Sequence, residues 1–573
     1  MNKFLKVLSF LLALIICFVL SVGCGGDGGG GDGGTGKGIE EKIDATRTQF
    51  YIGNYNGGYG DKWLRALKTR FENFYKEEHF EEGKTGVQVL IDNKKEEYKS
   101  IDNLGGTIGT SKNSIYFTEG LDYDKLVDKG WLLDFSEILS SPLTEYGESK
   151  SIYDKMSEQQ KNYYVVNGGK CYALPTYSAY FGTVYDIDLF EEYLLYFSAN
   201  TNNGNEGFIV SLNDTKSNGP DGKANTYDDG LPATYDDFFK LCARMDDCGI
   251  MPMIWSGQYM SSYMRQYAAA LMVDYEGETN ARVDFDFSGN CNTLVSGFDS
   301  QGSPILTSEE ITPSTGYKVF KQVGRYYSID FVKRIIDGEY FHSLSTNITL
   351  SHTGAQEEFL FSKYESGTKP IAMLAEGIWW QSEAVDAFDA VVTGYGEEAS
   401  QNNRRFGFMP YPKATQEKVG EGITLFDGLL STCFINANVK NNALMKDLAF
   451  KFIRFAHTDE SLKEFTKITN TPKSFDYEMS ASDLDELTTF GKSVYEIKDN
   501  ATVVYGYSSD SIGRKIPLTL LDGYLSTING LPYADLAKTL KEHPEFTAKM
   551  YFEGIATYYS HDKWTVNYGG MFN

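Results

Sequence analysis

The N-terminus constrains this chain more than any other feature. Residues 1–6 carry two lysines, an apolar run extends over 7–22, and Cys24 follows closely. A basic segment followed by an apolar segment and small residues is typical of an export signal. The alternative is a transmembrane anchor, but the run is short for a bilayer core that needs ~20 apolar residues. The chain is therefore expected to fold outside the cytoplasm.

The segment 20–24, Leu-Ser-Val-Gly-Cys, resembles a bacterial lipobox. It departs from the usual pattern at Ser21, where Leu or Val is normal. We predict that 1–23 is a signal peptide, that Cys24 is lipidated, and that 24–45 is a tether. Ten of the 14 residues from 25 to 38 are glycine, and such a coil spans roughly 20 Å. The folded body is expected at the outer face of the cytoplasmic membrane, held by lipid alone.

The composition is that of a globular protein with more than one core. Of 573 residues, 41% are hydrophobic and 14% aromatic, which excludes a disordered chain. Acidic residues outnumber basic ones by 79 to 53, a net charge of −26. This balance offers no basic surface for a phosphate backbone, so no nucleic-acid partner is expected.

Cysteine usage does not indicate a disulfide framework. Beyond Cys17 and Cys24, the spacing of the other five contains no CxxC pair, and we expect buried thiols. An oxidised Cys242–Cys248 pair is the alternative. The five are Cys171, Cys242, Cys248, Cys291 and Cys433.

Alternating strand and helix patterns predict α/β layers. Strands are expected at 48–55, 87–91 and 114–117, and helices from Asp61, from Thr234 and over 441–457. Two of the helices show apolar residues at i, i+4, i+8 and i+11, which is one face of a 3.6-residue period. These stripes are Trp63, Leu67, Phe71 and Phe74, and Leu444, Leu448, Phe452 and Phe455.

Seven local patterns in a fixed order carry a family resemblance. They lie at 168–175 (GGKCYALP), 184–190, 231–238, 249–255, 369–379, 407–412 and 448–460. Together they resemble the family 1 extracellular solute-binding proteins, the sugar-binding lipoproteins of ABC importers. Tyr235 replaces the usual Trp of the third pattern. The chain also carries extra sequence near 200–230, 275–316 and the C-terminus.

The resemblance implies an α/β fold of the periplasmic-binding-protein type II, with two discontinuous lobes joined by a hinge around a ligand cleft. Lobe 1 would contain 46–175 plus 415–475, and lobe 2 would contain 176–414 plus 476–573. A site between two rigid bodies can enclose a ligand while hinge residues absorb the motion.

Sugar binding needs flat apolar faces for C–H groups and planar hydrogen-bonding groups for hydroxyls. Trp379 falls on the family's "GxW" tryptophan, and Trp380 lies beside it. The other candidates follow strand ends or the crossing strand, where each could equally be a core or loop residue. They are Tyr55, Asn56, Glu119, Tyr177, Trp255, Tyr259 and Asp427.

The segment 214–230 gathers oxygen-bearing side chains between glycines, which suggests a structural calcium loop. It is not an EF-hand, since Lys216 holds the third position and no Glu stands at the twelfth. An exposed acidic turn is the alternative. The candidate ligands are Asp214, Asp221, Asp228 and Asp229.

The sequence contains no HExxH or GxSxG motif, and its six histidines lack metal spacing. We therefore expect a monomeric, non-enzymatic receptor without a cofactor that passes an oligosaccharide to ABC permease subunits. Two alternatives remain open: a surface glycan-binding lipoprotein without an importer, and an exported glycoside hydrolase.

Overall fold

The computed structural model describes most of the chain after the tether. The described residues are 39, 41–166, 168–428, 430–508, 513–516, 524, 526–528, 531–533 and 536–572. The predicted signal peptide and Cys24 lie outside them. No helix within these ranges has the length and apolarity needed to cross a membrane.

Two hydrophobic cores divide the described chain into lobes. The core of lobe 1 draws on 50–177 and 433–487, and that of lobe 2 on 180–426 and 490–564. The chain thus passes between lobes three times. The second and third passages come later than the boundaries predicted at 415 and 475. One reason is that β13 (Ile423–Asp427) pairs in parallel with β15 (Ala501–Tyr505), which keeps it in lobe 2.

Lobe 1 is built on a five-stranded sheet in the order β2-β1-β3-β14-β6. Strand β1 runs parallel to β2 and β3, while β14 is antiparallel to β3 and β6. Most residues of these strands are buried, polar ones included, as expected for a sheet covered on both faces. The strands are β1 (Thr48–Asn54), β2 (Val87–Asn93), β3 (Ile115–Glu119), β6 (Ala173–Pro175) and β14 (Ser431–Ile435).

Both predicted amphipathic helices of lobe 1 are present. Helix α2 (Lys62–Phe74) buries the first three residues of its stripe, whereas Phe74, at its last residue, is 52% exposed. Helix α15 (Ala443–Ala456) packs beside it, with the Phe71 and Phe452 rings 5.0 Å apart. The i, i+4 spacing therefore locates the buried face, except at the end of α2 and at Leu444 near the start of α15, which is half-buried.

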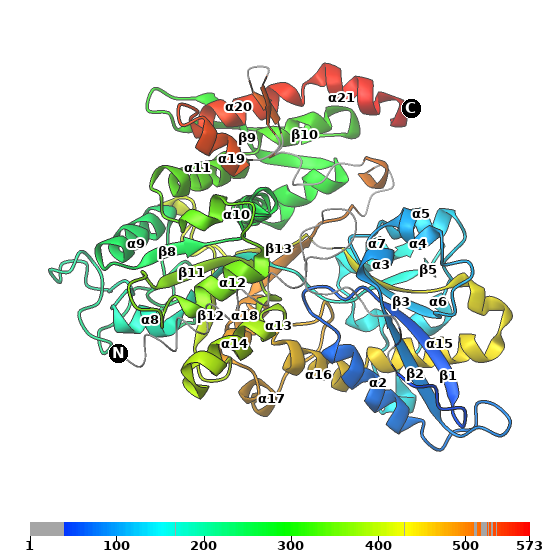
Figure 1. Cartoon of the computed structure of the whole chain (residues 1–573). Coiled ribbons are helices and arrows are strands. Elements are labelled where there is room, and N and C mark those ends of the chain that lie inside the picture. Colours follow the sequence, from blue (N-terminus) through cyan, green and yellow to red (C-terminus); the bar gives the residue numbers. More distant parts are fainter. Residues whose placement is uncertain are drawn as a thin grey trace, which may run out of the picture. The chain divides into compact units, whose positions relative to one another are not determined.

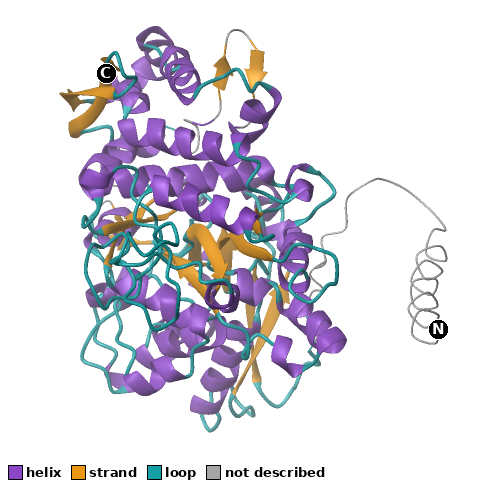
Figure 2. Cartoon of the chain, turned by 90° about the vertical axis from the view of Figure 1, so that its left-hand side faces the viewer, coloured by secondary structure: helices purple, strands orange, loops and turns teal. Residues whose placement is uncertain are grey.

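Lobe 2 contains a four-stranded sheet in the order β12-β7-β11-β8. Helix α9 (Tyr235–Asp247) begins at Thr234, whose side chain forms a capping box with Asp237, as the sequence predicts. Helices α10 (Met260–Asp286) and α11 (Val323–Asp337) pack on each other (Figures 1 and 2). The strands are β7 (Phe181–Asp186), β8 (Met251–Ile254), β11 (Ile371–Gly377) and β12 (Phe406–Met409).

Two of the three extra segments, 275–316 and the C-terminus, form a layer of their own on lobe 2. The hairpin β9 (Gly289–Phe298) and β10 (Pro304–Ile311) follows α10, and α20 (Ala548–Tyr558) packs on α11 (Figure 1). In α21 (His561–Tyr568), the buried Trp564 donates from Nε1 to the Pro313 carbonyl at 2.7 Å. The insertion and the C-terminus therefore stabilise each other.

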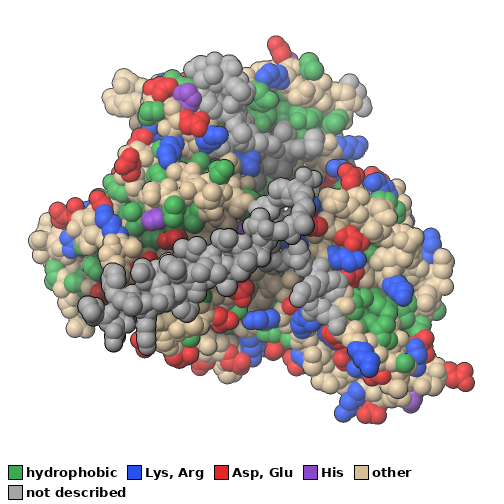
Figure 3. Space-filling model, in the orientation of Figure 1, with side chains coloured by type: hydrophobic (Ala, Val, Ile, Leu, Met, Phe, Trp, Pro, Cys, Tyr) green, Lys and Arg blue, Asp and Glu red, His purple; other side chains and the backbone are tan. Residues whose placement is uncertain are grey.

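Surface charge is mixed rather than segregated. On the face drawn in Figure 3, acidic and basic side chains are interspersed. The five cysteines after Cys24 are free, and all but the half-buried Cys248 are buried. Burial thus agrees with the prediction for four of the five and not for Cys248.

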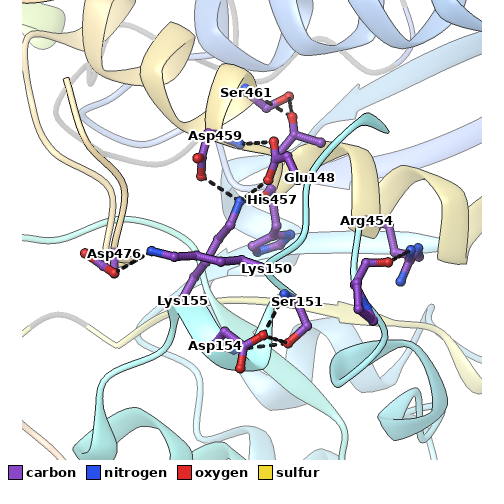
Figure 4. A network of polar contacts seen from close by, with 12 residues as sticks. Glu148, Lys150, Ser151, Asp154, Lys155, Arg454, His457, Asp459, Ser461 and Asp476 are labelled. Carbon is purple, nitrogen blue, oxygen red and sulfur yellow. Dashed lines mark hydrogen bonds and ion pairs between the residues drawn. The ribbon is translucent and has the colours of Figure 1, made fainter. Parts of the chain in front are cut away.

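A polar network within lobe 1 surrounds a fully buried lysine (Figure 4). The Lys155 ammonium lies 2.5 Å from Glu148 and 2.7 Å from Asp459, and it donates to the His457 carbonyl at 2.8 Å. Each ammonium proton thus has an acceptor, which is what burial of a charge requires. The network ties the segment before α7 (Glu158–Tyr164) to the end of α15.

We expect Lys155→Met to lower the free energy of unfolding by about 3 kcal/mol, because two carboxylates lose a buried partner. Lys150→Met is the matched control, since the Lys150–Asp476 pair is exposed and should cost less than about 1 kcal/mol. Urea unfolding of both variants measures the difference. Equal losses would contradict the role assigned to the network.

Candidate ligand-binding site

A glycine-containing loop after β1 forms the first part of the candidate site. The Tyr55 amide donates to the Phe117 carbonyl at 2.9 Å, which holds the loop beside the end of β3. A Cβ atom on Gly57 would lie 2.5 Å from Oε1 of Glu119. Only glycine therefore leaves room for this carboxylate.

Glu119 and Tyr177, both predicted from the sequence, lie in direct contact. The Tyr177 hydroxyl donates to Oε1 of Glu119. The Tyr177 ring packs 4.4 Å from that of Tyr59, whose hydroxyl donates to the Ser178 carbonyl at 2.7 Å. Burial raises the pKa of Glu119 to about 7, although the Tyr177 hydroxyl and the charge of Lys95 oppose this shift. The Glu119 carboxyl, at the end of β3, therefore keeps its proton to a higher pH than an exposed Glu does.

Trp379 is the point where the lobes meet. It follows β11 directly, is half-buried, and packs against the hydrophobic cores of both lobes. A Cβ on Gly58 of lobe 1 would lie 2.6 Å from its Cδ1 atom, and one on Gly377 would overlap its six-membered ring. Two glycines from different lobes therefore make space for one indole.

Two further carboxyl groups lie beside this indole, and the sequence analysis missed both. Glu376 is fully buried in β11, and Glu383 ends α13 (Trp380–Glu383). Nε2 of Gln356 lies 2.8 Å from Glu383 and 3.4 Å from Glu376, so one amide bridges both acids. The sequence does contain a signal for Glu376. It is the carboxylate within the apolar run 371–377, which needs polar partners if the strand is buried.

Burial raises the pKa of Glu376 to about 8, and the charge of Glu383 adds to the shift. The Tyr263 hydroxyl donates to its Oε2 at 2.8 Å, and the Gly377 amide donates to Oε1 at 2.9 Å. Glu376 is therefore protonated near neutral pH and fixed on both oxygens.

Tyr259 lies at the margin of this cluster. Its side chain is 40% exposed, and its ring lies 5.8 Å from the imidazole of His352. Nε2 of His352 is 3.4 Å from Oε1 of Glu383. Tyr259 thus offers an accessible aromatic face within reach of the acids around Trp379.

The structure corrects the assignment of Trp255 and Trp380 to the ligand site. Both are fully buried. The Trp255 ring packs 4.9 Å from Phe341, and the Trp380 ring packs 5.0 Å from Phe406. Neither indole presents a face on which a sugar can stack, so both are core residues of lobe 2.

The remaining predicted residues lie around the passages between lobes. Tyr55 and Asn56 are half-buried, and Oδ1 of Asn56 has no hydrogen-bond partner among the described residues. Asp427 is buried and accepts from the Ala179 amide at 3.2 Å. It therefore joins two passages, and this role is structural.

A cavity of about 440 Å³ also lies between the lobes, lined by Gln159 and Gln160 of α7, Ser178, Ser474 and β15. Gln159 bridges Glu278 and the Val503 carbonyl, and the Ser178 and Ser474 hydroxyls lie 3.0 Å apart. None of the residues predicted for the ligand site lines this cavity.

The acidic loop folds on itself. Asp228 is buried and accepts from the Asp221 amide at 2.8 Å, while Asp214 and Asp229 accept from amides of their own turns. Burial raises the pKa of Asp228 to about 6. Among the described residues, no group of three or more His, Cys, Asp or Glu is placed to hold a metal ion. The calcium loop stays a prediction.

No protein-family model matches the sequence, and the comparison with curated proteins found no match. A solved chitin oligosaccharide binding protein matches with a TM-score of 0.51 and 15% identity, over 91% of this chain and 100% of that chain. A probable secreted solute-binding lipoprotein from Streptomyces coelicolor matches with a TM-score of 0.50 and 11% identity, over 90% and 99%. The chain has the fold of the two-lobed solute-binding proteins. The predicted fold class is confirmed.

The raised pKa of Glu376 predicts a pH dependence of stability. An unfolded Glu releases its proton near pH 4.3, whereas the folded one holds it to about pH 8. The folded state therefore binds more protons in this window, and the free energy of unfolding falls as pH rises through it.

We expect Glu376→Gln to flatten this fall, because the amide cannot ionise. Thermal unfolding between pH 4.5 and 8.5 measures the effect as a difference from the parent chain. Glu365→Gln, at an exposed position of the same lobe, should leave the slope unchanged. If the stability of Glu376→Gln fell with pH as steeply as that of the parent chain, the pH dependence would belong to other groups.

Proposed function

We propose that this chain is a lipid-anchored extracytoplasmic receptor that binds an oligosaccharide and delivers it to the permease of an ABC importer. The observation that carries the proposal is Trp379, a half-buried indole held between glycines of both lobes. Glu383 lies with it against Gly58, and Glu119 lies against the neighbouring Gly57. An aromatic face with carboxylates around it matches the C–H surfaces and hydroxyls of a sugar ring.

The remaining support comes from the fold and the N-terminus. Both solved structures reported above are described as binding proteins, one of them for chitin oligosaccharides. The export signal, Cys24 and glycine-rich tether would place a monomeric receptor at the membrane surface, where a permease operates. A neighbouring permease gene pair would favour this reading over a surface glycan-binding lipoprotein.

A glycoside hydrolase is the second candidate, favoured by one observation. Glu376 has the raised pKa that suits a general acid. Its full burial argues against this role, because the proton must reach a glycosidic oxygen. Product analysis during the binding experiment separates the two functions.

We expect Trp379→Ala to weaken oligosaccharide binding roughly 30-fold or more, because a central aromatic contributes about 2 kcal/mol or more. Calorimetric titration with a panel of oligosaccharides, using the chain without residues 1–38, measures this loss. Trp131→Ala is the control, since Trp131 is a half-buried indole of lobe 1 outside the site. Equal affinities for Trp379→Ala and the parent chain would remove Trp379 from the site.

A further inference from the structure

Lobe 1 contains a second buried lysine, Lys473, whose surroundings differ from those of Lys155. Lys473 is 7% exposed and lies in the loop after α16 (Asp459–Thr469). Its ammonium makes no hydrogen bond or ion pair with any described residue, whereas Lys155 contacts two carboxylates and a carbonyl (Figure 4). A buried ammonium without an acceptor is costly unless something else satisfies it.

The ammonium of Lys473 faces a small cavity. Its nitrogen lies 4.2 Å from the ring centre of Phe465 and 4.8 Å from that of Trp63, and both rings line this cavity. The cavity volume is about 20 Å³, enough for a single atom of water size. Polyatomic ligands such as phosphate or a sugar are too large for it.

A second buried polar group lines the same cavity. Thr176 is 2% exposed, and its hydroxyl contacts the Cys433 thiol, with no oxygen or nitrogen partner of hydrogen-bond geometry among the described residues. Lys473 and Thr176 come from segments about 300 positions apart, so local turn geometry does not explain their convergence. The hydroxyl can accept from the thiol and still donate its own hydrogen, so the ammonium and the hydroxyl both offer a donor to this space.

The other titratable groups of the cavity wall do not supply that acceptor. Arg70 is cationic and already pairs with Glu460 at 3.0 Å, and Glu464 makes no ion pair with Lys473. Burial lowers the pKa of His457 to about 3 and raises that of the Cys433 thiol to about 11, so both are neutral. The positive charge of Lys473 therefore has no anionic partner in the wall.

We propose that lobe 1 binds one halide-sized anion, chloride in solution, between the Lys473 ammonium and the Thr176 hydroxyl. The two donors supply a charge and a hydrogen bond, and the rings of Trp63 and Phe465 lie beside the ammonium. Lys473 also lines the cavity of about 440 Å³ between the lobes, so the anion site borders that cavity. The site is separate from the proposed sugar site and does not depend on it.

The proposed anion lies next to the segments in which the chain passes between lobes. Thr176 follows β6 at the first passage, and Cys433 lies in β14 just after the second. Ser474, next to Lys473, contacts Ser178 and accepts from Gln160 through its carbonyl. A fixed Lys473 would therefore hold the segments on which the lobes meet.

Crystals of the chain without residues 1–38, soaked in sodium bromide, test the proposal through bromine anomalous scattering. We expect one peak between Lys473 and Thr176, absent in Lys473→Met and retained in Lys440→Met, an exposed lysine of the same lobe. If Lys473→Met does not fold, Thr176→Val replaces it. A water in the cavity without a bromine peak would overturn the proposal.

Thermal unfolding supplies a second readout. Replacing methanesulfonate, which is too large for the cavity, by chloride at constant ionic strength should raise the midpoint by about 2 °C. Burial lowers the pKa of Lys473 to about 7, so the ammonium that binds the anion prevails below this pH. The rise should therefore be larger at pH 6 than at pH 8.5. An equal rise in Lys473→Met would contradict a site at this residue.

Discussion

The threefold passage of the chain between lobes is the constraint on which the rest of the structure depends. Each core is assembled from distant segments, so both lobes are complete only when all passages are in place. Asp427 joins two of them, since its side chain accepts from the Ala179 amide and its carbonyl from the Gly506 amide at 2.8 Å.

Local sequence patterns predicted the elements well and the lobe boundaries less well. The stripes of α2 and α15 and the cap at Thr234 depend on neighbours within four residues, which the sequence displays directly. Strand β13 is different because its partner residues in β15 lie 78 positions away. An apolar strand at a passage fits either core, so only tertiary pairing decides its lobe.

The same distinction explains the candidate site. Glu119 ends β3, and Tyr177 and Trp379 each lie two residues beyond a strand. The structure brings Glu119 and Tyr177 into contact and places Trp379 against Gly58 of the loop that Glu119 also contacts through Gly57. Trp255 and Trp380 also follow strands, yet they point into a core. A tryptophan pattern alone does not separate these cases. Glu376 was detectable as a charge in an apolar strand, whereas its bridge through Gln356 to Glu383 requires the fold.

The acids beside Trp379 act as a unit rather than as separate charges. Two adjacent carboxyl groups in a desolvated place do not both ionise readily, and burial puts the proton on Glu376. A neutral Glu376 does not repel the carboxylate of Glu383. The Gln356 amide contacts both carboxyl groups and so holds them at fixed positions. The less buried Glu383 is then the group that would accept hydrogen bonds from a ligand in the proposed site. Deprotonating Glu376 would place a second charge beside Glu383, so the free energy of unfolding falls at alkaline pH.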